Sequence, residues 1–66
     1  MKIVVNGKNE EIAGQTSLLD FLSSKKIHPD KVVVELNMTI MEKQFLADTL
    51  IQENDRIEIL RFIGGG

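Results

Sequence analysis

The sequence has no cysteine, one histidine and one proline. Without a thiol, the chain has no disulfide, no thiolate metal ligand and no cysteine nucleophile. The lone histidine, His28, precedes Pro29 in a segment that we expect to be an exposed loop. One histidine in such a place supports neither a serine–histidine–acid triad nor a multi-histidine metal site. We interpret His28 as a solvent-facing residue without a catalytic role.

Net charge and long apolar runs are also missing. Ten acidic and eight basic residues give a formal charge of −2, without the basic excess typical of nucleic-acid-binding proteins. No apolar run exceeds three residues, whereas a signal peptide needs about 7 to 15 and a membrane helix about 18. We therefore expect a cytoplasmic protein that binds neither nucleic acid nor a membrane.

What is present is typical of one small globular domain. Of the 66 residues, 42% are apolar and 27% are charged, so the chain should fold alone. A domain of this size buries only roughly 60% of the surface exposed by its unfolded chain, which leaves little room for a large catalytic cavity. Gly7 and Gly14 are too far apart for a phosphate-binding loop, and the acidic residues show no metal-binding spacing.

The first half of the sequence predicts a hairpin followed by a helix. The β-branched segment 2–6 runs into Asn6-Gly7, a strong signal for a tight hairpin turn, and we place the second strand at about 9–13. Thr16 or Ser17 can cap a helix of about 17–26, which Lys25 and Lys26 would end favourably through the helix dipole. Its apolar face would consist of Leu18, Leu19, Phe21 and Leu22.

The second half predicts further strands. Residues 32–37 form an apolar strand covered on one face by the helix, and a last strand runs from Arg56 to about Phe62 after a turn at Asn54 and Asp55. Within the last strand, Ile59-Leu60 interrupts strict alternation and indicates burial on both sides or a bulge.

The segment between these strands, 38–50, has no clear period. There we expect a short strand or bend and one helical turn near 42–46, with Met38 and Met41 filling gaps in the core.

This order of elements predicts an α+β fold of the ubiquitin-like β-grasp kind, with a mixed sheet of four or five strands on one main helix. The domain would span residues 1–63 and would be followed by a flexible glycine tail, 64–66.

Gly64, Gly65 and Gly66 are the strongest functional signal. Three glycines add nothing to a core, but they can carry a carboxylate roughly 10 Å into a narrow channel of a partner. Such a carboxylate has a pKa of about 3.3 to 3.7 and is a poor electrophile, so it would need activation, for example as an acyl-adenylate. The alternative is that the glycines are an engineered addition or part of a linker.

The residues that carry a family resemblance are the opening MKIVVNG, the central AGQTSLLDFL and the closing NDRIEILRFIGGG. In this order they resemble the ThiS family of sulfur carriers in thiamine biosynthesis, over essentially the whole chain. The resemblance implies a β-grasp protein without catalytic side chains, whose C-terminal Gly66 is adenylated and then converted to a thiocarboxylate. One departure is Asn54, which stands between two acids where these families often have glycine.

The resemblance also implies partners. These are an E1-like adenylyltransferase (ThiF-like) that uses ATP, a thiazole synthase (ThiG-like) that receives the sulfur, and a sulfur donor such as a cysteine desulfurase system. The carrier itself would be no enzyme and would hold no cofactor stably. Gly64, Gly65 and Gly66 would enter the partners. Phe62 and Ile63 could either dock on them or complete the core of the sheet.

Two alternatives remain at this point. The small subunit of molybdopterin synthase is a similar sulfur carrier that also ends in Gly-Gly, although such chains tend to be longer and to have prolines before the tail, and residues 60–63 contain none. The other is a non-catalytic, ubiquitin-like interaction module whose tail has no chemistry.

Overall fold

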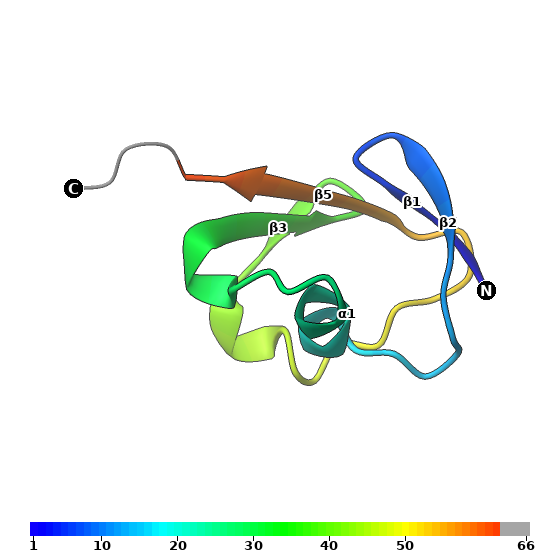
Figure 1. The fold of residues 1–66 in the computed structure, drawn as a ribbon, viewed down its shortest axis with the longest axis horizontal. Helices are drawn as coiled ribbons and strands as arrows, with labels where there is room; N and C mark the ends of the chain where they lie inside the picture. Colours follow the sequence, from blue (N-terminus) through cyan, green and yellow to red (C-terminus); the bar gives the residue numbers. More distant parts are fainter. Residues whose placement is uncertain (63–66) are drawn as a thin grey trace.

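The computed structural model describes residues 1–62, which form one sheet with a helix packed against one of its faces (Figure 1). No helix among these residues is long and apolar enough to span a membrane. The elements are, in chain order, β1 (Lys2–Val5), β2 (Lys8–Glu11), α1 (Leu18–Ser24), the 3₁₀ turn η1 (Pro29–Lys31), β3 (Val32–Leu36), β4 (Thr39–Met41), the 3₁₀ turn η2 (Lys43–Phe45) and β5 (Arg56–Arg61).

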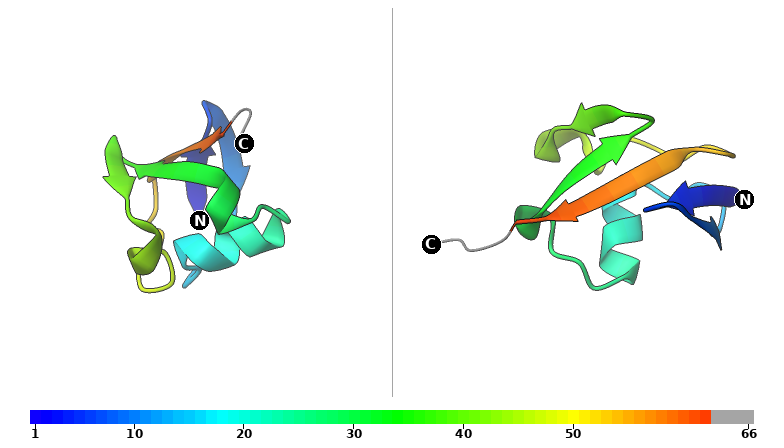
Figure 2. Two further views of the ribbon diagram at one scale, coloured as in Figure 1. Left: turned by 90° about the vertical axis from the view of Figure 1, so that its left-hand side faces the viewer. Right: turned by 90° about the horizontal axis from the view of Figure 1, so that it is seen from above.

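The sheet has the strand order β2-β1-β5-β3-β4, so the last strand lies in its centre. β5 runs parallel to β1 and antiparallel to β3, while β1–β2 and β3–β4 are antiparallel hairpins. Figure 2 shows β5 crossing the sheet between the two hairpins. A mixed five-stranded sheet on one helix confirms the predicted α+β, ubiquitin-like β-grasp class.

The two hairpins close with tight turns whose residues have positive φ angles. Asn6 (φ 49°) and Gly7 (φ 81°) adopt the left-handed conformation that the Asn-Gly signal predicts. β2 nevertheless starts at Lys8 and ends at Glu11, earlier than expected. Asn37 and Met38 (φ 50° and 71°) form an equivalent turn between β3 and β4.

Because Met38 lies at the tip of this second turn, its side chain is 89% exposed, so our assignment of Met38 to the core was wrong. Met41 is partly buried and does pack against the core.

Helix α1 is shorter than predicted but begins where its cap requires. The Ser17 hydroxyl accepts a hydrogen bond from the Asp20 N–H at 3.0 Å, which satisfies one of the free donors of the first turn. The helix ends at Ser24 instead of Lys26, because Lys26 has a φ of 60° that reverses the chain. The two lysines therefore follow the helix, and Pro29 begins η1 rather than lying in a plain loop.

The core lies between α1 and the inner face of the sheet. It consists of apolar side chains from the helix, from the three central strands and from the segment around η2: Ile3, Val5, Leu18, Phe21, Leu22, Val32, Val34, Leu46, Ile51 and Ile57. The short strand β4 and the helical turn η2 agree with the prediction for this irregular segment.

The turn before β5 forms without a glycine. Asn54 itself adopts the left-handed conformation, with a φ of 70°, which asparagine tolerates better than most residues. The Asp55 carboxylate accepts a hydrogen bond from the Gln52 N–H at 2.7 Å and another from the Asn37 amide at 3.0 Å. These bonds fix the point at which β5 enters the sheet.

We predict that Phe21→Ala destabilises the protein by about 3 to 5 kcal/mol, because Phe21 is 1% exposed and fills the centre of the core. Urea unfolding followed by circular dichroism measures this. Since that loss equals the whole stability of many small domains, Ile57→Val, at about 0.5 to 1.5 kcal/mol, provides a milder test. The control is Phe62→Ala, expected to stay within about 0.5 kcal/mol of wild type. An equal loss for Phe62→Ala and Phe21→Ala would contradict this core.

Candidate functional site

The site predicted from the sequence follows the end of β5. Ile63, Gly64, Gly65 and Gly66 lie outside the described residues. Phe62 is described: its N–H donates to the Lys31 carbonyl at 3.2 Å, so it continues the pairing of β5 with β3. Its side chain is 63% exposed and is therefore no part of the core. A role of Phe62 in docking remains a prediction.

Near its C-terminal end, β5 is held at Ile59 by an interaction that we did not predict. The Asn6 side chain accepts a hydrogen bond from the Ile59 N–H at 2.7 Å and donates one to the Ile59 carbonyl at 3.3 Å. It thus extends the pairing of β5 one step beyond Val5 and Ile57, the last paired residues of β1 and β5. The Asn-Gly motif pointed to the turn and gave no signal for this second role.

The two faces of the sheet differ near the end of β5. Leu60 lies on the outer face, away from α1, and is 50% exposed, whereas Ile59 faces inward and is partly buried against the core. Strict alternation is thus preserved. The expected two-sided burial or bulge at Ile59-Leu60 was wrong, because Leu60 is an exposed apolar residue on a regular strand.

On the helix side of β5 lies an open groove of about 320 Å³. Lys8, Lys25 and Arg61 line it together with Glu10, which forms an ion pair with Lys25 at 2.6 Å. The groove is therefore mainly basic and lies beside the last residues of β5.

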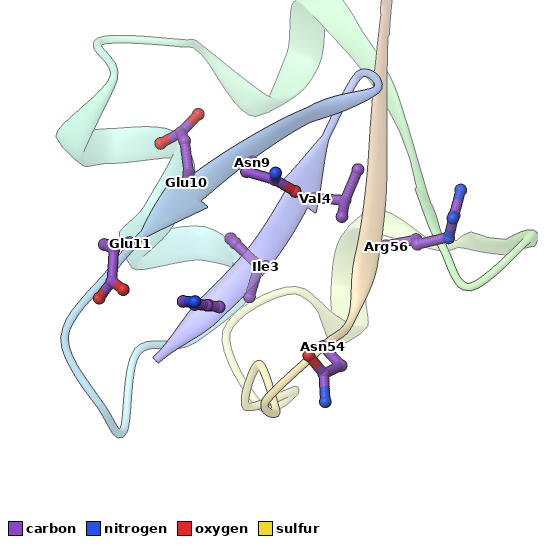
Figure 3. A pocket seen from close by; sticks show the side chains of 8 residues that line it. Ile3, Val4, Asn9, Glu10, Glu11, Asn54 and Arg56 are labelled. Carbon is purple, nitrogen blue, oxygen red and sulfur yellow. The ribbon is translucent and has the colours of Figure 1, made fainter.

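A larger hollow of about 450 Å³ lies at the other end of β5 (Figure 3). It is lined by side chains from β1, β2 and the start of β5, among them Lys2, Glu11 and Arg56. From Arg56 to Arg61 a strand extends roughly 17 Å, so this hollow is remote from the predicted site. Its charges are mixed, and it holds no histidine, serine or threonine.

The lone histidine has a structural role. His28 Nδ1 accepts a hydrogen bond from the Asp30 N–H at 3.2 Å and caps η1. Asp30 is also hydrogen-bonded to the Lys43 ammonium, which holds the pKa of that carboxyl below its usual value. This contact joins η1 to η2. Residues 1–62 contain no group of three or more side chains suited to a metal ion.

Comparisons with known proteins agree on one family. The ThiS family model matches residues 3–66. The fold matches the crystal structure of a thiamine biosynthesis protein (ThiS) from Geobacter metallireducens with a TM-score of 0.87 and 33% sequence identity, covering 100% of both chains.

Two curated relatives are longer proteins. The chain is 36% identical over 66 residues to a thiazole synthase of Magnetococcus marinus and 33% identical to one of Paramagnetospirillum magneticum. All of this chain is covered in both matches, but it spans only 20% of the length of either relative.

We predict that Asn6→Gly lowers the free energy of unfolding by about 1 kcal/mol, because glycine retains the turn but loses the bonds to Ile59. Hydrogen exchange should show a less protected Ile59 amide. The control is Asn54→Gly, which changes the same residue type at a positive φ but removes no side-chain hydrogen bond found in residues 1–62, and should cost nothing. Unchanged protection of the Ile59 amide in Asn6→Gly would argue against a stabilising role of the two hydrogen bonds between Asn6 and Ile59.

Proposed function

Because the chain belongs to the ThiS family, we propose that it is a sulfur carrier of thiamine biosynthesis and that Gly66 carries the sulfur. The observation that carries this proposal is the match of the whole fold, over the full length of both chains, to a ThiS protein. The position of β5 supports it further, since this central strand is the last element before Gly64, Gly65 and Gly66 in the sequence.

The proposed chemistry takes place at the α-carboxylate of Gly66. An oxygen of this carboxylate attacks the α-phosphorus of ATP in an E1-like (ThiF-like) partner, and pyrophosphate leaves. In the resulting acyl-adenylate, AMP is a good leaving group on a carbonyl carbon that is now electrophilic. The terminal sulfur of a donor persulfide, such as that of a cysteine desulfurase system, then attacks this carbon and AMP leaves, which gives an acyl disulfide. A second thiol of the partner system attacks the donor's sulfur, forms a disulfide with it and releases the thiocarboxylate. The partners supply the ATP site and the catalytic groups, so the carrier acts as a co-substrate and not as an enzyme.

The carrier's own contribution is to hold the strand that precedes its reacting end in a defined place. β5 is fixed by β3 as far as Phe62 and by Asn6 at Ile59. From that point the glycines, which have no side chains, give the thinnest backbone that can enter a partner's channel. In this proposal residues 1–63 form the body and 64–66 the tail, with Phe62 and Ile63 at the rim of the partner's channel.

The recipient of the sulfur is proposed to be a thiazole synthase (ThiG-like). This is supported by the two relatives in which a segment matching this whole chain is part of a longer protein named thiazole synthase. A shared chain keeps two reacting groups at high effective concentration. We place the reaction in the cytoplasm, where the partner finds ATP.

Intact mass spectrometry tests the proposed modification. We predict that incubation with ATP, the adenylating partner and a sulfur source raises the mass by the difference between one sulfur and one oxygen. Fragmentation should place the change at Gly66. Omission of ATP is the control and should leave the mass unchanged. An unchanged mass with a partner shown to be active would instead favour a ubiquitin-like interaction module.

Deletion of Gly66 separates folding from function. We predict an unfolding midpoint within error of wild type, because glycine has no side chain that could pack in a core. Sulfur loading should be abolished, since the chain would then present the carboxylate of Gly65 one residue short of the reacting atoms. Loading of the shortened protein at the wild-type rate would refute the role of Gly66.

A further inference from the structure

The outer face of the sheet carries two glutamates directly opposite each other. Glu35 of β3 pairs with Glu58 of β5 in the strand register. Like charges at directly opposite positions destabilise a sheet. Arg56 lies on the same face, two residues before Glu58, yet none of the ion pairs among residues 1–62 involves Arg56, Glu35 or Glu58. The contacts among the described residues therefore do not explain why two glutamates lie opposite each other.

Apolar side chains surround the two glutamates. Val33 and Leu60 form the next opposite pair on the same face, and Ile40 lies opposite Glu35 on β4. Ile40 and Leu60 are 65% and 50% exposed, and Phe62 follows with 63%. α1 and η2 lie on the other side of the sheet, and no described element covers this one (Figure 1). We call this surface, made of Val33, Glu35, Ile40, Glu58, Leu60 and Phe62, the acidic sheet face.

We infer that the acidic sheet face docks on thiazole synthase, at a surface where an arginine or lysine is surrounded by apolar side chains. A cation between Glu35 and Glu58 would turn their repulsion into two charge-assisted hydrogen bonds. The apolar rim would exclude water and strengthen these bonds. This inference rests on the proposed function, because it assigns the docking surface of the same carrier.

Chain geometry favours this face over a remote one. Gly66 is four residues beyond Phe62, and four extended residues span at most roughly 14 Å. An enzyme that takes Gly66 into its active site must therefore come close to the end of β5. Leu60 and Phe62 lie at that end, and Glu58 is only about 7 Å farther along the strand.

The charge of this face and the two longer relatives both favour thiazole synthase over a second copy of this chain as the partner that binds here. A second copy of this chain would bring two more glutamates to the same place, which opposes self-association through this face. Thiazole synthase is favoured as the occupant because two relatives combine it with a matching segment in one chain.

The test compares two double variants with the same change in charge. Glu35→Gln/Glu58→Gln removes the acidic pair. Glu42→Gln/Asp48→Asn removes two exposed acids that flank η2 in the sequence, and η2 lies on the α1 side of the sheet (Figure 1). We expect the first variant to bind thiazole synthase of the same organism about tenfold more weakly, with a flatter salt dependence. The second variant should bind as wild type does. Titration calorimetry at two salt concentrations measures both.

Stability separates docking from folding. Glu35→Gln/Glu58→Gln should unfold at the same or a higher urea concentration than wild type, because a repulsion is removed. Leu60→Ser, which changes the apolar rim, should also weaken binding without unfolding the protein. Equal affinities of wild type and Glu35→Gln/Glu58→Gln would overturn the inference. The inference would also be overturned if Glu35→Gln/Glu58→Gln lost binding to the adenylating partner but not to thiazole synthase. A wild-type dimer in ultracentrifugation that is absent in this variant would overturn it as well.

Sulfur loading distinguishes failure of this inference from failure of the proposed function. If wild-type protein gains sulfur at Gly66 and binds thiazole synthase, but the acidic pair has no effect on binding, only the docking surface is wrong. If wild-type protein gains no sulfur with an active partner, the proposed function fails together with the docking surface that rests on it.

Discussion

The pairing of β5 with a neighbour on each side is the interaction on which the rest of this structure depends. β5 meets β1 in parallel and β3 in antiparallel orientation, so it joins two hairpins that would otherwise be separate. A two-stranded hairpin alone is marginally stable at best. Ile57 of β5 is also part of the core under α1. The first strand therefore gains its place in the sheet only when the last strand is present.

This arrangement separates the work of the two sides of β5. Its inward residues, Ile57 and Ile59, hold the body together, whereas its outward residues, Glu58 and Leu60, remain available to a partner. The glycines follow this strand in the sequence, so a partner that binds them, as proposed, would come close to the outward residues of β5. A protein of this size needs no catalytic cavity if its partners supply the chemistry.

The sequence predicted those parts of the fold that depend on local signals. Asn6-Gly7 and the apolar face of α1 each act through neighbouring residues, and both predictions were confirmed. The irregularity expected at Ile59-Leu60 was wrong, because the exposure of Leu60 depends on what covers the sheet and not on its neighbours in the sequence. Met38 was wrong because a positive φ at a methionine follows from its hairpin and not from its own preference. The hydrogen bonds between Asn6 and Ile59 and the pairing of Glu35 with Glu58 depend on strand register, which one sequence does not define.

The central place of β5 also determines how the molecule responds to force. In the proposed function an enzyme binds the C-terminal residues, so a force that separates the two proteins would pass along β5. The hydrogen bonds to β3 run perpendicular to this direction, so five paired positions must shear together instead of opening one after another. The β5–β1 pairs share the load on the other side. An enzyme that binds the C-terminal residues could thus release the carrier while its sheet stays folded.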